Sequence, residues 1–322
     1  MAAAEPLYRD VLAANPKHAD ALHMLGLLHY QTGRASEAID LIRDAIGNNP
    51  DTAWYHSNLG RILNETKRFD EAVDAYGQAA LLDPGLAEAP ANQAIALEAL
   101  ERWDEAEAAL GRALELAPDN PDLLFGLGKI LASRKRFDEA IDRFRRVAAL
   151  APDHSEARRN LGLALSLVGD FEAAATVYAE VLSLEPGDIE LQIDRDIALI
   201  RSGRHKEAIA GLEATLLGQP EHVRAHYSLG LALKNDYRIA DARDRFEMVL
   251  RRQPNHAFAM IELGGCLQRE KNIDGAMALY GRAFRLNSNH FASIIKTMTA
   301  IPYGRFSADF EQMRRRLQSA GA

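Results

Sequence analysis

The residues with the clearest chemical potential lie together in the segment GDIELQIDRDIALIRSGR. Asp194, Arg195 and Asp196 are adjacent there, so two carboxylates and a guanidinium group could provide an acid–base pair or an ion site. Further along, His222 and His226 lie four residues apart, a spacing that places two imidazoles on one helix face and suits a metal ion. Whether either group forms a site depends on the elements that carry it.

A period of 34 residues runs through most of the chain. When the recurring proline is counted as the thirty-second residue, eight full units extend over residues 19–290. A half unit, the second helix only, occupies residues 1–18, and residues 291–322 are predicted to form C-terminal capping helices. The prolines stand at Pro16, Pro50, Pro84, Pro118, Pro152, Pro186, Pro220 and Pro254.

Each unit contains two apolar stretches at helical spacing, separated by a short turn. Alanine recurs at the twentieth place, and six units have Leu-Gly at the seventh and eighth places, as in Leu127-Gly128. These small residues allow the two helices of a unit to approach closely, whereas a large side chain would push them apart. The proline ends the second helix because it lacks an amide donor and disfavours helical geometry in the residue before it.

The pattern HSNLGRILNETKRFDEAVDAYGQAALLDP resembles the tetratricopeptide repeat, and the resemblance covers nearly the whole chain. It implies an all-α fold, a right-handed α-solenoid of antiparallel helix pairs whose first helices line a concave groove. Because one helix pair cannot bury its apolar face alone, we expect stability to come from the stacking of neighbours.

The same period explains the residues that suggested chemistry. Gly128, in the FGLGK stretch that resembles part of a phosphate loop, is the repeat's own glycine, and His222 shares the last place of a unit with four other histidines. The sequence contains no Walker loop, His-Glu-x-x-His, Cys-x-x-Cys or nucleophile elbow. We therefore predict no catalytic residues, no metal and no cofactor, and a chain that is not an enzyme.

The resemblance implies that six places of each unit face the groove. Asparagine at the sixth place suits a peptide backbone, because an amide offers both donors and an acceptor; the alternative is that asparagine is simply common there. The lysine, asparagine and arginine set of a carboxylate clamp is not complete in any three consecutive units. The candidate binding residues are Asn58, Arg61, Asn92, Phe125, Lys129, Arg159, Asn160, Leu163, Ile193, Ile197, Ile200, Tyr227, Leu231 and Ile261.

The candidates from Leu163 onward are mainly apolar. A contiguous exposed apolar strip marks a partner site, so we expect a helix or an extended apolar segment to dock there. The competing interpretation is that these side chains pack against adjacent helices.

The whole pattern favours a protein–protein interaction scaffold or adaptor that binds a peptide or a partner helix. The alternative is the substrate-recruiting region of a larger glycosyltransferase or sulfotransferase. A net charge of −8 argues against nucleic acid, and no apolar run is long enough to span a bilayer. With a single cysteine, Cys266, and no secretory signal, we expect a cytoplasmic protein, and the composition suggests a bacterial source.

Both ends are candidates for self-association. The half unit at 1–18 leaves an apolar face without a partner helix. At the other end, a helix after Ser307 carries Phe310, Met313 and Leu317 on one stripe. We expect this helix to cap the array, since terminal repeats need a cover; the alternative is an arm that docks on another subunit.

One unit, residues 189–222, departs from the pattern. Arg195 and Asp196 replace its Leu-Gly pair, so either the first helix is rotated to expose Asp196 or an arginine such as Arg201 or Arg204 pairs with it. Gly211 inside the second helix and Thr215 also weaken the unit. We therefore predict that residues 189–218 are the softest joint of the array.

Overall fold

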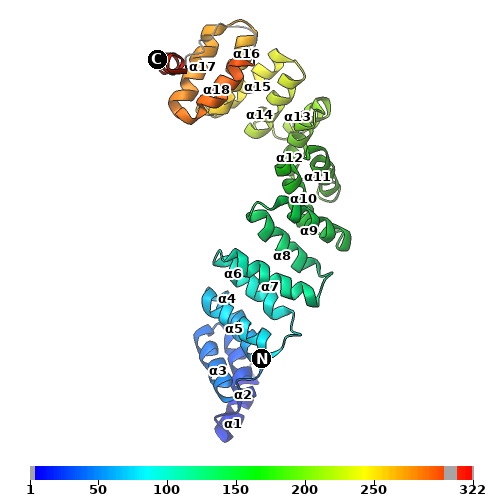
Figure 1. Ribbon diagram of the computed structural model, residues 1–322, viewed down its shortest axis with the longest axis vertical. Helices are drawn as coiled ribbons and strands as arrows, with labels where there is room; N and C mark the ends of the chain where they lie inside the picture. Colours follow the sequence, from blue (N-terminus) through cyan, green and yellow to red (C-terminus); the bar gives the residue numbers. More distant parts are fainter. Residues whose placement is uncertain (1–3, 301–309, 321–322) are drawn as a thin grey trace. The chain divides into compact units, whose positions relative to one another are not determined.

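The computed structural model describes residues 4–300 and 310–320, apart from the side chain of Phe310, and within these residues all regular structure is helical (Figure 1). A single helix, α1 (Ala4–Ala14), precedes eight helix pairs. The first helices are α2 (Ala19–Gln31), α4 (Ala53–Glu65), α6 (Glu88–Ala99), α8 (Pro121–Ser133), α10 (Ser155–Val168), α12 (Ile189–Arg201), α14 (Val223–Asn235) and α16 (Ala257–Arg269).

The second helices are α3 (Ala35–Asn48), α5 (Phe69–Leu82), α7 (Trp103–Leu116), α9 (Phe137–Leu150), α11 (Phe171–Leu184), α13 (His205–Gly218), α15 (Ile239–Arg252) and α17 (Ile273–Leu286). A short 3-10 turn, η1 (Ser288–His290), leads into α18 (Phe291–Thr299), and α19 (Phe310–Ser319) is the last described helix. No described helix combines the length and the apolar composition that a bilayer crossing needs.

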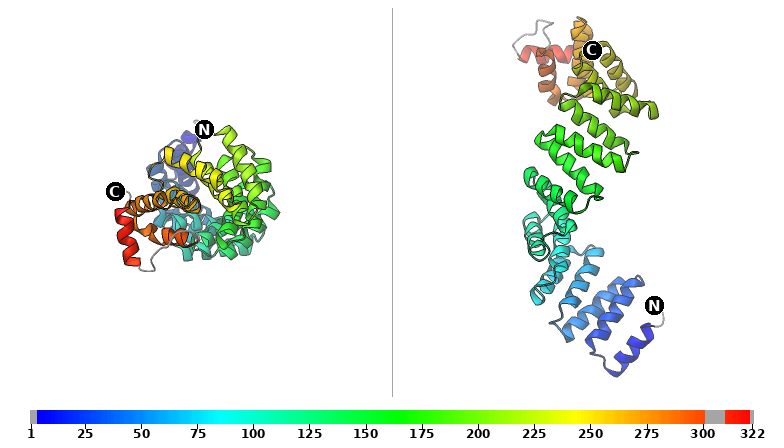
Figure 2. Two further views of the ribbon diagram at one scale, coloured as in Figure 1. Left: turned by 90° about the horizontal axis from the view of Figure 1, so that it is seen from above. Right: turned by 90° about the vertical axis from the view of Figure 1, so that its right-hand side faces the viewer.

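The chain divides into two compact units, Met1–Ala164 and Leu165–Ala322, which we call the N-terminal and C-terminal units. The division falls inside α10. Within each unit, successive antiparallel pairs stack on one another as an α-solenoid (Figure 2).

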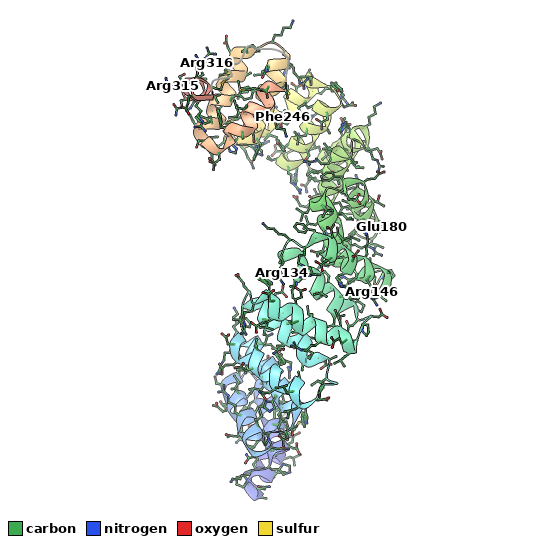
Figure 3. All side chains as sticks on the ribbon, in the orientation of Figure 1. Arg134, Arg146, Glu180, Phe246, Arg315 and Arg316 are labelled. Carbon is green, nitrogen blue, oxygen red and sulfur yellow. The ribbon has the colours of Figure 1, made fainter. Side chains whose placement is uncertain are left out.

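The recurring small residues bring the two helices of a pair together. A Cβ atom added to Gly128 in α8 would lie 2.5 Å from the Phe144 ring of α9, and one added to Gly230 would lie 2.6 Å from the ring of Phe246 (Figure 3). Both aromatic rings are completely buried. Glycine on the first helix therefore provides the space that the large residue of the second helix fills.

The turn inside each pair has one residue in the left-handed region, and these residues also recur every 34 positions. Three of them are glycines, such as Gly169 at φ 91°, but Lys135 and Tyr237 adopt φ values of 61° and 63°. Side chains are disfavoured in this region, so the geometry of the pair imposes the turn even where glycine is absent.

Ion pairs join neighbouring helix pairs on the surface of the N-terminal unit. Arg134 and Arg136 both reach Glu107 of the preceding pair, at 2.6 and 2.7 Å, and Arg146 reaches Asp119 at 2.5 Å (Figure 3). Exposed pairs such as Arg146–Asp119 contribute about 0–1 kcal/mol each. The stacking of apolar side chains is the main source of stability.

The C-terminal helix caps the array within the chain. Met313 and Leu317 of α19 are buried in a cluster with Tyr280 and Phe284 of α17. Arg285 donates to the carbonyl oxygen of Ala320 at 2.7 Å, which stabilises the C-terminal end of α19. The apolar stripe that suggested self-association is thus covered by the chain's own residues, although the side chain of Phe310 lies outside the described residues.

Helix α1 is different, because none of its residues is buried. Leu12 packs against the cluster of Leu22, Ala45 and Tyr55, but Leu7 remains 64 % exposed. Self-association through this face remains a prediction.

In the unit at 189–222, the structure decides between the two alternatives for Asp196. The side chain is completely buried, so the prediction of a rotated helix that exposes Asp196 is wrong. An arginine does pair with it, but the partner is the adjacent Arg195, whose Nη2 lies 2.6 Å from Oδ1, and not Arg201 or Arg204. The second oxygen, Oδ2, has no hydrogen-bond partner among the described residues.

Gly211 and Thr215 have structural roles that the sequence did not suggest. A Cβ atom on Gly211 would lie 2.6 Å from Asp196 Oδ1 and 2.7 Å from Arg195 Nη2, so the missing side chain makes room for the ion pair. The Thr215 hydroxyl lies 3.3 Å from Gln192 Oε1 and donates to the Gly211 carbonyl at 3.1 Å. Both residues fit a polar contact between α12 and α13.

Candidate functional site

The candidate residues of the N-terminal unit lie on four first helices. Asn58 and Arg61 belong to α4 and Asn92 to α6. Phe125 and Lys129 lie on α8, and α10 carries Arg159, Asn160 and Leu163. All are exposed or half-buried, as a binding surface requires.

Two of the three asparagines use their amide within their own helix. Asn58 donates to the Trp54 carbonyl at 3.0 Å and lies 3.3 Å from His23 Nε2, and Asn160 donates to the Glu156 carbonyl at 2.9 Å. An amide has two donors, so Asn160 can still donate to a peptide, whereas Asn58 would have to exchange one of its two contacts. Recognition of a peptide backbone by these residues remains a prediction.

A cluster of aromatic rings lies beside Asn58. The His23 ring stacks on Tyr55 at 4.7 Å and meets the Trp54 ring edge-on at 4.4 Å. Burial lowers the pKa of His23 to about 4, so this imidazole is neutral near pH 7. Trp54 is 45 % exposed and offers an apolar contact beside the asparagine.

The cationic candidates of the N-terminal unit already have partners. Lys129 lies 3.6 Å from Glu98 and 5.8 Å from the centre of the Phe125 ring. Arg61 lies 3.7 Å from Glu65 and 5.6 Å from the centre of the Tyr30 ring. A ligand would have to compete with these contacts.

In the C-terminal unit the structure contradicts the predicted apolar strip. Ile193, Ile200 and Ile261 are buried, with exposed fractions of 0, 6 and 2 %. They pack against neighbouring helices, which is the competing interpretation of these residues. Ile197, Tyr227 and Leu231 are only half-buried, so they remain candidates for contact with a partner.

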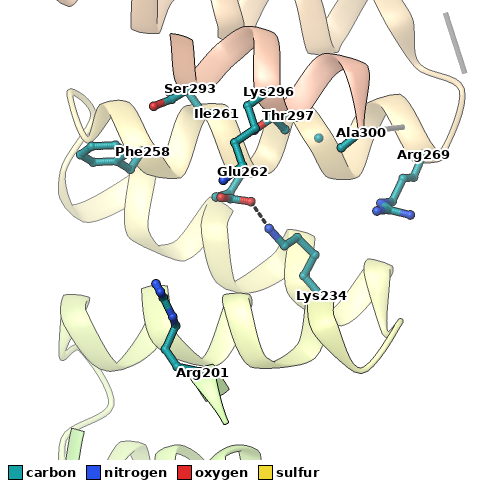
Figure 4. Close-up of a pocket in the computed structure, with 11 residues that line it drawn as sticks. Arg201, Lys234, Phe258, Ile261, Glu262, Arg269, Ser293, Lys296, Thr297 and Ala300 are labelled. Atoms are coloured by element: carbon teal, nitrogen blue, oxygen red, sulfur yellow. Dashed lines mark hydrogen bonds and ion pairs between the residues drawn. The ribbon is translucent and has the colours of Figure 1, made fainter. Parts of the chain in front are cut away.

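A hollow of the C-terminal unit has a volume of about 530 Å³ and is lined by three first helices and α18 (Figure 4). Arg201 comes from α12, Lys234 from α14, Arg269 from α16 and Lys296 from α18. We call this hollow the basic pocket.

Among the described residues, a single carboxylate lines the basic pocket. Glu262 of α16 accepts an ion pair from Lys234 at 2.5 Å, drawn as a dashed line in Figure 4. Phe258, 50 % exposed, stands at one edge, and the floor includes Ile261 and Gly265. The pocket thus combines a cationic lining with an apolar surface.

The chemistry suited to this arrangement is binding of an anionic ligand. Burial raises the pKa of Cys266, on the same helix, to about 12, which keeps its thiol protonated near pH 7. Within residues 4–300 and 310–320, no group of three or more His, Cys, Asp or Glu side chains could hold a metal ion.

The sequence prediction found only Ile261 of the pocket residues. The cations were not predicted because the apolar side chains of this region gave the stronger signal and because Lys296 lies beyond the last complete unit. A signal was nevertheless present, since Arg201, Lys234 and Arg269 all occupy groove-facing places of their units.

Comparison with known proteins identifies the repeats. Two models described as tetratricopeptide repeat match the chain, one over residues 97–162 and 167–232 and the other over residues 2–53, 38–92, 136–189 and 238–290. No curated protein matches the chain.

Solved structures share the fold at low sequence identity. YrrB, described as a TPR protein with an unusual peptide-binding site, is 21 % identical, with a TM-score of 0.53 over 58 % of this chain and 96 % of its own. A tetratricopeptide repeat protein from Parabacteroides merdae is 17 % identical, with a TM-score of 0.52 over 76 % of this chain and 97 % of its own. MamA is 21 % identical, with a TM-score of 0.51 over 52 % of this chain and 92 % of its own.

The matches to the two family models together cover most of the chain. They agree with the 34-residue period and with the paired helices. This chain belongs to the tetratricopeptide repeat family.

Proposed function

We propose that the protein is an interaction scaffold or adaptor that binds a peptide or a helix of a protein partner on its first helices. The observation that carries this proposal is the basic pocket, which is formed by three first helices and α18 with no contribution from a second helix. Side chains at groove-facing places thus converge on one hollow large enough for several peptide residues.

Two further observations support binding. In the N-terminal unit, polar and aromatic side chains remain accessible on successive first helices, among them Asn58, Asn92 and Trp54. The structurally similar YrrB is described as having a peptide-binding site. We expect roughly micromolar affinity, about −8 kcal/mol.

Peptide selection followed by titration tests the proposal. Peptides selected from a random displayed library against the whole chain would be titrated into the wild type and into Phe258→Ala. Since Phe258 is a half-exposed aromatic at the pocket edge, its truncation should weaken binding by about tenfold.

The matched control is Leu217→Ala, which truncates an 86 % exposed apolar residue on a second helix. This variant should bind the selected peptides as tightly as the wild type does. Equal losses in both variants, or no loss with Phe258→Ala, would contradict binding at the basic pocket.

A further inference from the structure

The charge of the basic pocket is opposite to that of the whole protein. The chain carries a net charge of −8, yet four cationic side chains and one carboxylate line this hollow. A concave site lined by one sign of charge concentrates ligands of the opposite sign.

Three of these four cations have no carboxylate partner among the described residues. Lys234 pairs with Glu262, but Arg269 and Lys296 form no ion pair with any carboxylate of the described residues. Arg201 stacks on the Phe171 ring at 4.7 Å and likewise has no carboxylate partner in the described part of the chain. Figure 4 shows Arg201 and Lys234 extending from adjacent helices toward the side of the pocket that holds Glu262.

Two arginines next to second helices of the same unit differ from the pocket cations. Arg204 and Arg238, the N-cap residues of α13 and α15, pair with Glu207 and Asp241 at 2.6 and 2.7 Å. Within residues 4–300 and 310–320, Arg201, Arg269 and Lys296 have no such carboxylate partner and can pair with an external anion.

The volume and the lining of the pocket indicate which kind of anion it could bind. A volume of about 530 Å³ exceeds that of a single small anion, and Phe258 presents a half-exposed ring beside the charges. A ligand that uses both features has several carboxylates and an adjacent apolar side chain. Nucleic acid fits less well, because its affinity depends on many phosphate contacts over a basic surface.

Deepening the proposed function, on which this inference rests, we propose that the basic pocket binds an acidic segment of a protein partner. Carboxylates of the segment pair with Arg201, Arg269 and Lys296, and a neighbouring apolar side chain contacts Phe258. Glu262 holds Lys234 at the pocket wall, and the cations of the pocket repel segments that are themselves basic.

The test uses the whole chain and a fluorescein-labelled oligoglutamate peptide that contains one phenylalanine. Arg269→Glu combined with Lys296→Glu should weaken binding at least about tenfold, because two attractive charges become repulsive. Both side chains are exposed, so folding should be unaffected. Binding by the wild type should also weaken as salt is raised.

The control is Lys206→Glu combined with Arg251→Glu, which makes the same change in net charge at two exposed residues of second helices. Retained binding in the control and loss in the pocket variant support the proposal. Equal losses in both, or no loss in either, overturn it, and so does tighter binding of a single-stranded oligonucleotide at the same residues.

A second readout separates this inference from the proposed function. If the wild type does not bind the acidic probe but binds neutral peptides from the library in a Phe258-dependent manner, the preference for acidic segments is wrong and the scaffold function stands. If neither the acidic probe nor any library peptide binds, both proposals fail.

Discussion

Two units of the array solve the same packing problem in opposite ways. In the unit at 121–154, Gly128 on the first helix leaves room for the buried Phe144 ring of the second. In the unit at 189–222, the first helix carries the buried Asp196 instead, and the glycine, Gly211, is on the second helix. In both units one small residue faces one large group.

Both units preserve the close approach of the two helices of a pair. A glycine on either helix satisfies it, provided that the opposing side chain occupies the vacated space. The second solution has an electrostatic cost, since the buried carboxylate needs Arg195 and still leaves Oδ2 without a partner.

Removing the partner of the buried carboxylate should give the largest effect. Arg195→Leu leaves Asp196 without its ion pair, which we expect to lower the free energy of unfolding by about 4 kcal/mol. Urea denaturation followed by circular dichroism measures this loss. Arg204→Leu, which breaks a surface pair with Glu207, should cost about 0–1 kcal/mol; a similar loss in both variants would rule out a special role for Arg195.

The second-largest effect should be the change in stability with pH that Asp196 causes. Burial raises its pKa from 3.8 to about 6, with Arg195 opposing the shift. The folded state therefore binds the proton more tightly than the unfolded state. The resulting stabilisation is complete below about pH 4 and is lost as the pH rises through 6, a change of up to about 3 kcal/mol.

The non-titrating variant Asp196→Asn provides the reference for this pH dependence. Denaturant unfolding of both proteins between pH 4 and 8 should show the wild type losing stability relative to the variant as the pH rises. Parallel curves would mean that Asp196 is not protonated in this range.

Filling the space beside Phe144 should lower the free energy of unfolding by somewhat less than these two effects. Gly128→Ala places a Cβ atom 2.5 Å from a completely buried ring, so we expect a loss of about 2 kcal/mol in urea denaturation. Gly111→Ala, in a helix where a Cβ atom meets nothing within 4 Å, should instead stabilise the protein by up to about 1 kcal/mol. Equal effects at the two glycines would contradict the packing role of Gly128.

A double-mutant cycle tests the exchange of small and large residues directly. Gly211→Ala should destabilise the wild type because the new methyl group meets the Asp196–Arg195 pair. In an Asp196→Gly background the methyl group has room, so we expect a coupling free energy of about 1 kcal/mol. Additive effects would show that Gly211 does not serve Asp196.

The smallest effect concerns local opening. We expect amides of residues 189–218 to exchange a few-fold faster than those of the matched segment 121–150, because a buried ion pair replaces apolar packing. Hydrogen exchange followed by mass spectrometry resolves the two segments. Equal or slower exchange in 189–218 would show that Gly211 and the Arg195 pair compensate fully.

Much of the fold was predictable because the same local sequence signals recur in every repeat. The recurring proline, the small residues and the helical spacing each set a boundary or a contact within a few residues of themselves. The binding surface was harder to predict. Exposure of Ile193, Ile200 and Ile261 depends on how tightly neighbouring helices pack, and that distance is not encoded in the place of a residue within its unit.

The sequence by itself determined the number of repeats, the pairing of helices within each and the need for a small residue where they meet. Only the tertiary structure decided that Arg195 pairs with Asp196, that Gly211 gives them space, and that Met313 and Leu317 of the last helix pack back on the array. It also decided that Arg201, Arg269 and Lys296 line one pocket, although about 95 residues separate the first from the last. Local helix signals act over a few residues, whereas these contacts arise from stacking of helices that are far apart in the chain.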